Sequence, residues 1–379
     1  MSNRLESIQV SGFKSIRELD IKLRDLNVLI GANGSGKSNF ISLFRLLNEI
    51  LESRLQTYSG AIGADSLLYY GRKTTSEIDI TLTFVDDNYA NGYEISLIPS
   101  EQGTLIFAYE GYSFHDRSRY ANGLDYRVGE GHRETLLFDV SEQYRRRVVV
   151  DYVIDTLSNW KIYHFHDTSP DSAIKQAGNI HENDRLKPDA SNLAAYLYLL
   201  QEKYPSYYRK IMRTVKRVTP FFDDFVLRPN PLNEDTIRLQ WRDVNSADNV
   251  FNAHTLSDGT LRFMCLATLL LQPDEKLPSL ILIDEPELGL HPFAINILVS
   301  LLRSVATKTQ VILSTQSVPL INQFDLEDII VVDRKDKQST FARLDTETFD
   351  DWMTEYSGYG IGDLWEKNVI GGRPQREAS

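Results

Sequence analysis

Apolar and polar positions change their spacing several times along the chain, and each spacing predicts a different element. Val28, Leu29 and Ile30 form a short apolar run before a glycine-rich stretch, which predicts a buried strand. From Phe40 to Leu51 apolar residues return every three or four positions, the spacing of an amphipathic helix. The sequence therefore predicts a strand and a helix joined by a glycine-rich loop.

Two further apolar runs occur late in the chain. Leu280–Ile283 and Val311–Leu313 have the length and composition of buried parallel strands. The polar turn "TLSDGTLRF" at residues 255–263 leads into a helical run made of Phe263, Met264, Leu266, Ala267, Leu269 and Leu270. Strands that alternate with helices predict an α/β fold with a parallel sheet.

The middle of the chain has a different pattern. Ile78, Ile80, Leu82 and Phe84 alternate with polar residues, and the turn-like "DDNYANG" precedes the strand-like segments "YEISLIP" and "TLIFAY". We expect an antiparallel β subdomain here, followed by a helical insertion that includes residues 191–218. No long heptad repeat occurs, so an extended coiled coil is not expected.

Composition narrows the class of protein. The 379 residues are 42% hydrophobic and 25% charged, enough for a large core in two or three compact units or one elaborated domain. The single cysteine, Cys265, excludes a disulfide within the chain and fits a reducing compartment. No apolar stretch has transmembrane length, and "MSNRLESIQV" is too polar for a secretory signal. We expect a soluble cytoplasmic protein with no membrane contact.

The glycine-rich stretch satisfies G-x-x-x-x-G-K-[ST] from Gly31 to Ser38, between a strand and a helix as that motif requires. Backbone N–H groups of such a loop and the helix N-terminus favour phosphate oxygens, whereas the alternative is a chance glycine turn. Lys37 should reach the β- and γ-phosphates, and Ser38 should hold Mg²⁺. The predicted nucleotide-binding residues are Asn33, Gly34, Ser35, Gly36, Lys37, Ser38 and Asn39.

Polar residues follow both late apolar runs. Asp284 and Glu285 end the first run, at the edge where ligands bind in open α/β sheets. Asp284 suits the Mg²⁺ shell, and Glu285 would orient or activate a water, although a solvated acidic turn is the simpler alternative. Gln316 follows the second run and could hold that water or sense the γ-phosphate; it could equally be a polar residue with no catalytic part.

These motifs together resemble those of a known group. "GANGSGKSN", "LSDGTLR", "LILIDEPELGLHP" and "ILSTQS" occur in the order of the ABC-type ATPase heads, and "VSGFKSIRELDIKL" is similar to the start of the SMC/RecF/OLD-like branch. The resemblance covers roughly residues 1–50 and 250–335. With its tail "LWEKNVIGG", the chain looks like RecF-like AAA family ATPases without a Toprim domain.

The resemblance implies an α/β P-loop NTPase head that hydrolyses ATP with Mg²⁺. In that group two heads pack head to tail, so Ser257 and Gly259 would serve the nucleotide of the neighbouring copy. Lys14 and Ser15 would approach the nucleotide from the N-terminal turn. One departure is Gln316, where many such heads carry histidine, because glutamine cannot carry a proton charge. No Q-loop glutamine is evident, and by this resemblance His166 or Asp167 would stand in its place.

The motifs divide the chain into five parts. They are an N-terminal head part with the P-loop (1–60), a β-rich subdomain (61–165), a helical or mixed insertion (166–250), a C-terminal head part (251–335) and a tail (336–379). The clustered histidines and acids around residues 164–184 match no ligand spacing of a structural metal. About fifty residues follow "DIIVVD" without an Asp-x-Asp, so we expect any nuclease activity on another polypeptide.

The net charge of −12 opposes a basic surface overall but permits a local one. The helical stretch "YYRKIMRTVKRV" places five basic side chains on one face, a candidate DNA-backbone contact with a solvated face as its alternative: Arg209, Lys210, Arg213, Lys216 and Arg217. "YRRRVVV" at 144–150 is a second basic cluster with the same two alternatives, a DNA contact or a solvated face.

The favoured function is an ATP-dependent, dimerising head in DNA repair or anti-phage defence. The alternative is a regulatory ATP switch that controls a separate effector protein.

Overall fold

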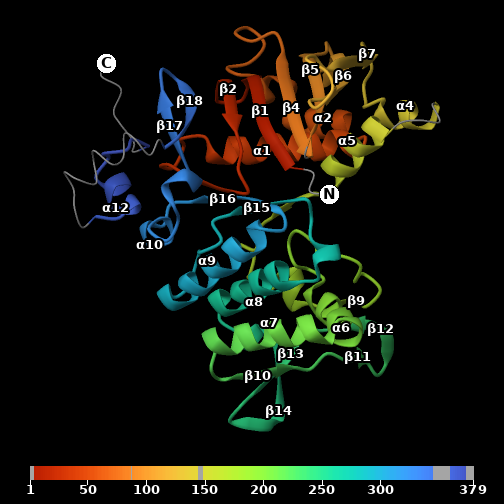
Figure 1. The fold of residues 1–379 in the computed structure, drawn as a ribbon. Coiled ribbons are helices and arrows are strands. Elements are labelled where there is room, and N and C mark those ends of the chain that lie inside the picture. Colours follow the sequence, from red (N-terminus) through yellow and green to blue (C-terminus); the bar gives the residue numbers. More distant parts are fainter. Residues whose placement is uncertain (1–3, 87, 144–147, 345–358, 373–379) are drawn as a thin grey trace. The chain divides into compact units, whose positions relative to one another are not determined.

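The computed structural model describes residues 4–86, 88–143, 148–344 and 359–372 (Figure 1). The basic cluster at 144–150 lies partly outside these ranges. The chain divides into two compact units, the first formed by Met1–Ile162 with Asp325–Ser379 and the second by Tyr163–Phe324. Each unit contains strands and helices. Among the described residues no helix has the combination of length and hydropathy needed to cross a membrane.

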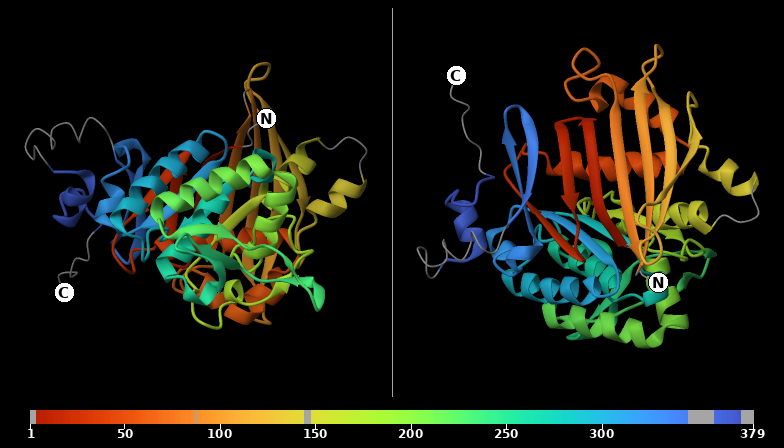
Figure 2. Two further views of the ribbon diagram at one scale, coloured as in Figure 1. Left: turned by 90° about the horizontal axis from the view of Figure 1, so that it is seen from below. Right: turned by 45° about the horizontal axis from the view of Figure 1, so that its top comes forward.

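The first unit contains an antiparallel sheet, as predicted for the middle of the chain, and two strands from the N-terminal residues 4–22 belong to it as well. This six-stranded sheet has the order β2-β1-β4-β5-β6-β7, and every neighbouring pair is antiparallel. These strands stand side by side in Figure 2, with colours that run from red through orange to golden yellow. They are β1 (Arg4–Phe13), β2 (Ile16–Lys22), β4 (Ile78–Asp86), β5 (Tyr89–Pro99), β6 (Leu105–Asp116) and β7 (Leu124–Gly129).

One face of this sheet is apolar because its strands alternate. The four apolar residues predicted to face inward from β4, which include Phe84, are all fully buried. Phe84 packs against Trp160 of β8 (Trp160–Tyr163) at 5.9 Å between ring centroids. Phe44 of α1 (Lys37–Leu51) meets the same indole at 5.3 Å. The helix that follows the glycine loop is thereby anchored to the core of the first unit.

The strand before the glycine loop is part of a second pairing in the first unit. β3 (Leu26–Ile30) runs parallel to β17 (Ile329–Lys335), which forms an antiparallel hairpin with β18 (Gln338–Arg343). All five residues of β3 are buried, as the apolar run predicts. The other helices in the described part of this unit are α2 (Leu55–Ile62), α3 (Ala64–Leu67), α4 (Leu137–Gln143), α5 (Val148–Ser158), α12 (Ile361–Glu366) and the 3₁₀ turn η4 (Leu326–Asp328).

The second unit contains the other two predicted strands, β15 (Leu280–Asp284) and β16 (Gln310–Thr315), as a parallel pair. Two small antiparallel sheets accompany them, in the orders β10-β13-β14 and β11-β12-β9. Their strands are β9 (Gly178–Asn179), β10 (Phe222–Phe225), β11 (Pro229–Asn230), β12 (Asn233–Ile237), β13 (Gln240–Asp243) and β14 (Ser246–Asn252).

The helical stretch predicted over 191–218 is two helices. Pro205 begins the second helix, because a proline lacks the N–H that a continuing helix would need but fits the first helical position. The helices of this unit are α6 (Leu193–Lys203), α7 (Pro205–Val218), α8 (Asp258–Leu271), α9 (Pro292–Ala306) and α10 (Val318–Ile321), with 3₁₀ turns η1 (Ala173–Lys175), η2 (Ala253–Thr255) and η3 (Asp274–Lys276). No long coiled coil occurs in the described part of the chain.

Candidate active site

The glycine loop has a backbone that larger residues could not adopt. Gly34 and Gly36 have φ values of 79° and 122°, in the left-handed region that favours glycine. A Cβ atom at Gly36 would lie 2.1 Å from Ser339 Oγ, whereas one at Gly34 would meet nothing within 4 Å. Gly36 is therefore required by close packing as well as by its backbone angles. The loop leads directly into α1, which begins at Lys37.

Lys37 is held inside the loop that it follows. Its Nζ donates hydrogen bonds to the carbonyl oxygens of Gly31 and Ala32, the second at 3.0 Å, and the residue is only 7% exposed. Ser38 is exposed on the first turn of the same helix. A positive charge, a hydroxyl and the N-terminus of a helix around a glycine cradle form a donor set that fits triphosphate oxygens and Mg²⁺.

The outer side of the loop is held by a chain of hydroxyl groups. Ser339 Oγ of β18 donates to the carbonyl oxygen of Ser35 at 2.6 Å and lies 2.6 Å from Ser15 Oγ. Asn39 Nδ2 donates to Ser15 Oγ at 2.6 Å. The structure thus brings predicted residues from the N-terminal turn and the P-loop together. Sequence reasoning missed Ser339, because this serine lies about three hundred positions after the P-loop, in a polar strand that carries no motif.

Lys14 occupies the turn between β1 and β2 with φ of 50°. Its backbone N–H donates to Leu67 at 2.9 Å, which fixes the turn. Burial, with a smaller contribution from the charge of Arg45, lowers the pKa of the Lys14 ammonium. Another contact on the loop comes from the tail, where the Gly372 carbonyl accepts the N–H of Ala32 at 2.8 Å.

In the second unit the ends of β15 and β16 carry the predicted carboxylates and their partners. The parallel register pairs Asp284 with Ser314, whose hydroxyl donates to Asp284 Oδ1. Gln316 Nε2 donates to Glu285 Oε1 at 3.2 Å. Two residues that the sequence assigned separately to catalysis are therefore in contact. Glu285 has φ of 43°, a strained angle for a non-glycine residue, and its N–H donates to Ser314 O at 2.9 Å.

Glu287 is a third carboxylate at this edge, and sequence reasoning did not single it out. Thr315 Oγ1 donates to its Oε1, while Oε2 is buried without a hydrogen-bond partner among the described residues. Burial raises the pKa of the Glu287 carboxyl, and the hydrogen bond from Thr315 opposes this shift. The signal in the sequence was the segment "DEPE", in which Glu287 follows Asp284 and Glu285 after a single proline. Three successive residues of the β16 segment thus each contact one of the three acids.

The signature segment begins α8, where Ser257 Oγ accepts the N–H of Thr260 at 3.2 Å as a helix cap. A Cβ at Gly259 would lie 2.2 Å from Gly289 O, so glycine is needed where the helix meets the loop after Glu285. Arg262, which sequence reasoning missed, donates to the carbonyls of His166 at 2.8 Å and Leu288 at 3.0 Å. It ties the signature helix to both neighbouring loops.

Of the two proposed Q-loop substitutes, His166 lies at the carboxylate edge, with Nε2 2.9 Å from the carbonyl oxygen of Asp284. Asp167 instead accepts hydrogen bonds from Ser169 within its own turn.

Elsewhere in this unit, the five basic side chains of α7 are all exposed, opposite its buried Ile211 and Val215. One of them, Lys216, pairs with Asp223 at 3.2 Å.

A P-loop on one strand–helix unit and carboxylates at the ends of parallel strands define a P-loop ATPase head of the SMC/RecF/OLD-like branch, as the motifs predicted. Residues 26–322 match the AAA_21 family, described as "AAA domain, putative AbiEii toxin, Type IV TA system". The chain belongs to this family.

Individual relatives agree with this assignment. The chain is 24% identical over 379 aligned residues to the Old nuclease of Escherichia phage P2, and the match covers 90% of this chain but 61% of that protein. This chain therefore spans about three fifths of the relative's length.

Solved structures support the predicted fold. An SMC head bound to the C-winged helix domain of ScpA is similar with a TM-score of 0.61 and 16% identity, over 91% of this chain and 99% of that one. An SMC head from Pyrococcus furiosus, bound to the C-terminal domain of ScpA, has a TM-score of 0.57 and 16% identity, over 93% and 99%. Both have the predicted head fold.

Burial of Glu287 predicts a pH-dependent effect of its replacement. The pKa of this carboxyl is raised above its ordinary value of 4.5, so the folded protein binds a proton more tightly than the unfolded chain. The contribution of Glu287 to wild-type stability should therefore fall as pH rises above about 4.5. Glu287→Gln keeps an acceptor for Thr315 without a charge, so its melting temperature at pH 7 should exceed that of wild type by a few degrees.

The difference should vanish below pH 4.5, where both states of the wild type are protonated. Thermal unfolding followed by circular dichroism over this pH range measures it. Glu202→Gln, which replaces an exposed carboxylate on α6, is the matched control and should change little. A Glu287→Gln protein that is less stable than wild type at pH 7 would show that the ionised carboxylate contributes to folding.

Proposed function

We propose that this protein is an ATP-hydrolysing head whose P-loop and strand-end carboxylates act on one Mg²⁺-bound nucleotide. The observation that carries the proposal is the contact of Gln316 with Glu285 beside Asp284, in a chain whose glycine loop has left-handed backbone angles at Gly34 and Gly36. Membership of an ATPase family and the fold of an SMC head support it.

Each predicted residue has a role in this proposal. The P-loop backbone and Lys37 bind the β- and γ-phosphates, while Ser38 and Asp284 hold Mg²⁺, which neutralises phosphate charge. Glu285 orients the attacking water and accepts its proton. Gln316 is a positioning residue, because its amide donates to Glu285 and fixes the carboxylate that faces the water. Lys14 and Ser15 act from the N-terminal turn, and Asn33 to Asn39 complete the cradle.

The same proposal includes dimerisation on ATP. Ser257 is exposed at the N-terminus of α8, a 14-residue helix, and its position in the signature segment is supported by the resemblance to ABC-type heads. Ser257 and Gly259 of one copy would contact the γ-phosphate held by the other copy. A composite site of this kind couples ATP binding to association, because each nucleotide contributes to the interface.

We assign the ATPase head to DNA repair or anti-phage genome defence, in the cytoplasm. The similarity to a phage-encoded nuclease and the family's description, which names a toxin–antitoxin system, support this assignment. The exposed basic face of α7 supports a contact with the DNA backbone. Mg²⁺-ATP would drive the head between an open and a dimeric state.

A second candidate is a regulatory ATP switch that binds and controls a separate effector protein. The net charge of −12 favours it, because an acidic protein has little general affinity for DNA. The two SMC heads were solved with a protein partner, which supports a head that acts through another polypeptide. The DNA-binding measurement below separates the two candidates.

Two substitutions test hydrolysis. Lys37→Ala should abolish ATP binding in a calorimetric titration, because no other cation replaces its ammonium at the β- and γ-phosphates. Glu285→Gln should bind ATP with unchanged affinity but hydrolyse it at least about a hundredfold more slowly, because an amide cannot accept the proton. Glu202→Gln is the control. Wild-type turnover in Glu285→Gln would exclude Glu285 as the base.

Mixing two inactive variants tests the shared site. Ser257→Arg should bind ATP but neither dimerise nor hydrolyse it, because bulk and charge block closure over the partner's γ-phosphate. A mixed dimer with Lys37→Ala contains one site with both defects and one site with neither. Activity should partly return when mixed dimers form, as verified by differently sized tags. A signature segment that serves its own P-loop gives no rescue at any mixing ratio.

The double variant Arg213→Glu with Arg217→Glu tests the DNA contact of α7. Each lost phosphate contact should lower the salt dependence of DNA binding by about one unit of log K per log salt. Fluorescence anisotropy at several salt concentrations measures the slope. Arg127→Glu, an exposed arginine on β7 of the first unit, is the control. Unchanged affinity and slope would leave the α7 face as ordinary solvated surface and favour the effector switch.

A further inference from the structure

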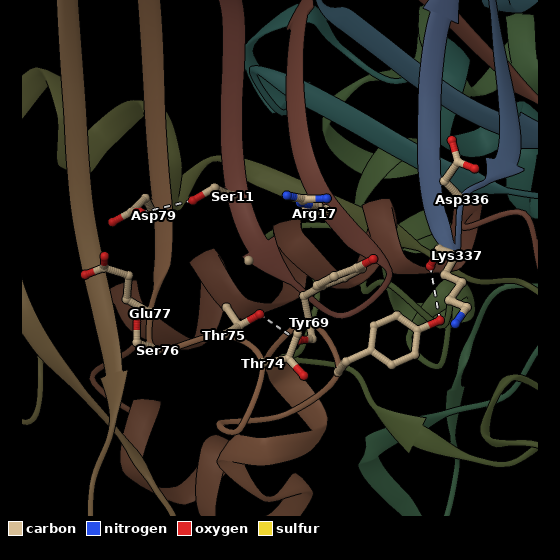
Figure 3. Close-up of a pocket in the computed structure, with 12 residues that line it drawn as sticks. Ser11, Arg17, Tyr69, Thr74, Thr75, Ser76, Glu77, Asp79, Asp336 and Lys337 are labelled. Carbon is tan, nitrogen blue, oxygen red and sulfur yellow. Dashed lines mark hydrogen bonds between the residues drawn. The ribbon is translucent and has the colours of Figure 1, made fainter.

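A second concave site lies in the first unit, outside the P-loop (Figure 3). Its volume is about 700 Å³, within the usual range for small-ligand sites. Three segments line it, namely the β1–β2 hairpin, the segment between α3 and β4, and the β17–β18 turn. None of the P-loop residues 31–38 lines this cavity. A chemical role for it therefore has to come from its own residues.

The β17–β18 turn places a lysine where glycine would be less strained. Lys335 pairs with Gln338, so Asp336 and Lys337 form a two-residue loop with φ values of 50° and 64°. Two left-handed residues define the primed turn that asparagine and glycine usually form. A lysine in this conformation is strained, and strained residues gather at functional sites. The side chain of Lys337 lines the cavity.

Tyr70 is a second residue with a strained backbone in the lining of this cavity. Its φ is 54°, in a region that costs a side chain of this kind about 1–2 kcal/mol. Its hydroxyl donates to Lys337 O at 3.1 Å and lies 3.2 Å from Arg334 Nη2. Its ring meets the ring of Tyr69 edge to face at 4.8 Å. A half-exposed aromatic ring fixed at both ends is a preorganised stacking surface (Figure 3).

Charged groups of both signs surround these rings. Arg17 and Lys337 line the cavity, and neither forms an ion pair within the described residues. Glu77 and Asp336 add exposed carboxylates. Cations suit a phosphate, aromatic rings suit a planar base, and carboxylates accept hydrogen bonds from base amino or ribose hydroxyl groups. A simple anion would use only the cations, whereas a nucleotide would also use the rings and the carboxylates, so this combination favours a nucleotide.

We propose that this cavity binds one nucleotide unit, with its base against Tyr70 and Tyr69 and its phosphate at Arg17 and Lys337. The site is separate from the P-loop and goes beyond the proposed ATPase activity. A nucleotide unit could come from free nucleotide or from an unpaired stretch of single-stranded DNA. The chemistry of recognition is the same for both sources.

The test uses the full chain with Lys37→Ala, so that the P-loop does not contribute to binding. The probes are a fluorescent short oligodeoxyadenylate and 2′-deoxyadenosine 5′-monophosphate, whose adenine carries the amino group that the carboxylates would accept from. Both should bind, and Arg17→Ala and Lys337→Gly should each weaken binding about tenfold. Lys22→Ala, an exposed lysine on the same strand as Arg17 and outside the cavity, should leave affinity within about twofold.

Lys337→Gly also separates binding from folding. Glycine relieves the left-handed turn, so the melting temperature should stay the same or rise while affinity falls. A strand bound much more tightly than the monophosphate identifies single-stranded DNA as the source, and equal affinities identify free nucleotide. Three results would overturn the proposal. The wild-type chain could bind neither probe, the Lys37→Ala chain could lose the binding that the wild type has, or both cavity variants could bind the probes as tightly as the Lys37→Ala chain does.

Discussion

The register of β15 against β16 is the constraint on which the carboxylate site depends. It sets Asp284 opposite Ser314, and the next residues of the β16 segment then meet Glu285 and Glu287. Side chains of a strand alternate between faces, so a slip of one residue would exchange every partner. The positions of these acids are therefore fixed by the buried apolar residues that set the register, although those residues carry no chemistry themselves.

A similar dependence governs the P-loop in the first unit. Ser339 occupies the space beside Gly36 and donates to the carbonyl of Ser35, and Ser15 joins it from the N-terminal turn. The loop is thus held from outside by groups that are distant in sequence. The hairpin that supplies Ser339 also ends in the turn of Lys337. One short hairpin therefore contributes both to the P-loop and to the cavity proposed to bind a nucleotide unit.

Charge is distributed locally rather than uniformly over this acidic chain. Five basic side chains lie on the exposed face of α7 in the second unit, and Arg17 and Lys337 line the cavity of the first unit. The net charge of −12 weakens unspecific attraction to nucleic acid, so contacts of this kind depend on geometry. Family membership defines the ATPase head, whereas the proposed contacts with nucleic acid depend on these local surfaces.

The sequence by itself determined the class of fold and the P-loop, because strand and helix periods and a contiguous motif are local properties. It also located Asp284 and Glu285, which follow a buried apolar run directly. Only the tertiary structure decided that Gln316 contacts Glu285, that Glu287 is buried, and that Ser339 supports the loop. These contacts join residues far apart in the chain, and their geometry follows from strand pairing and packing, which no local pattern encodes.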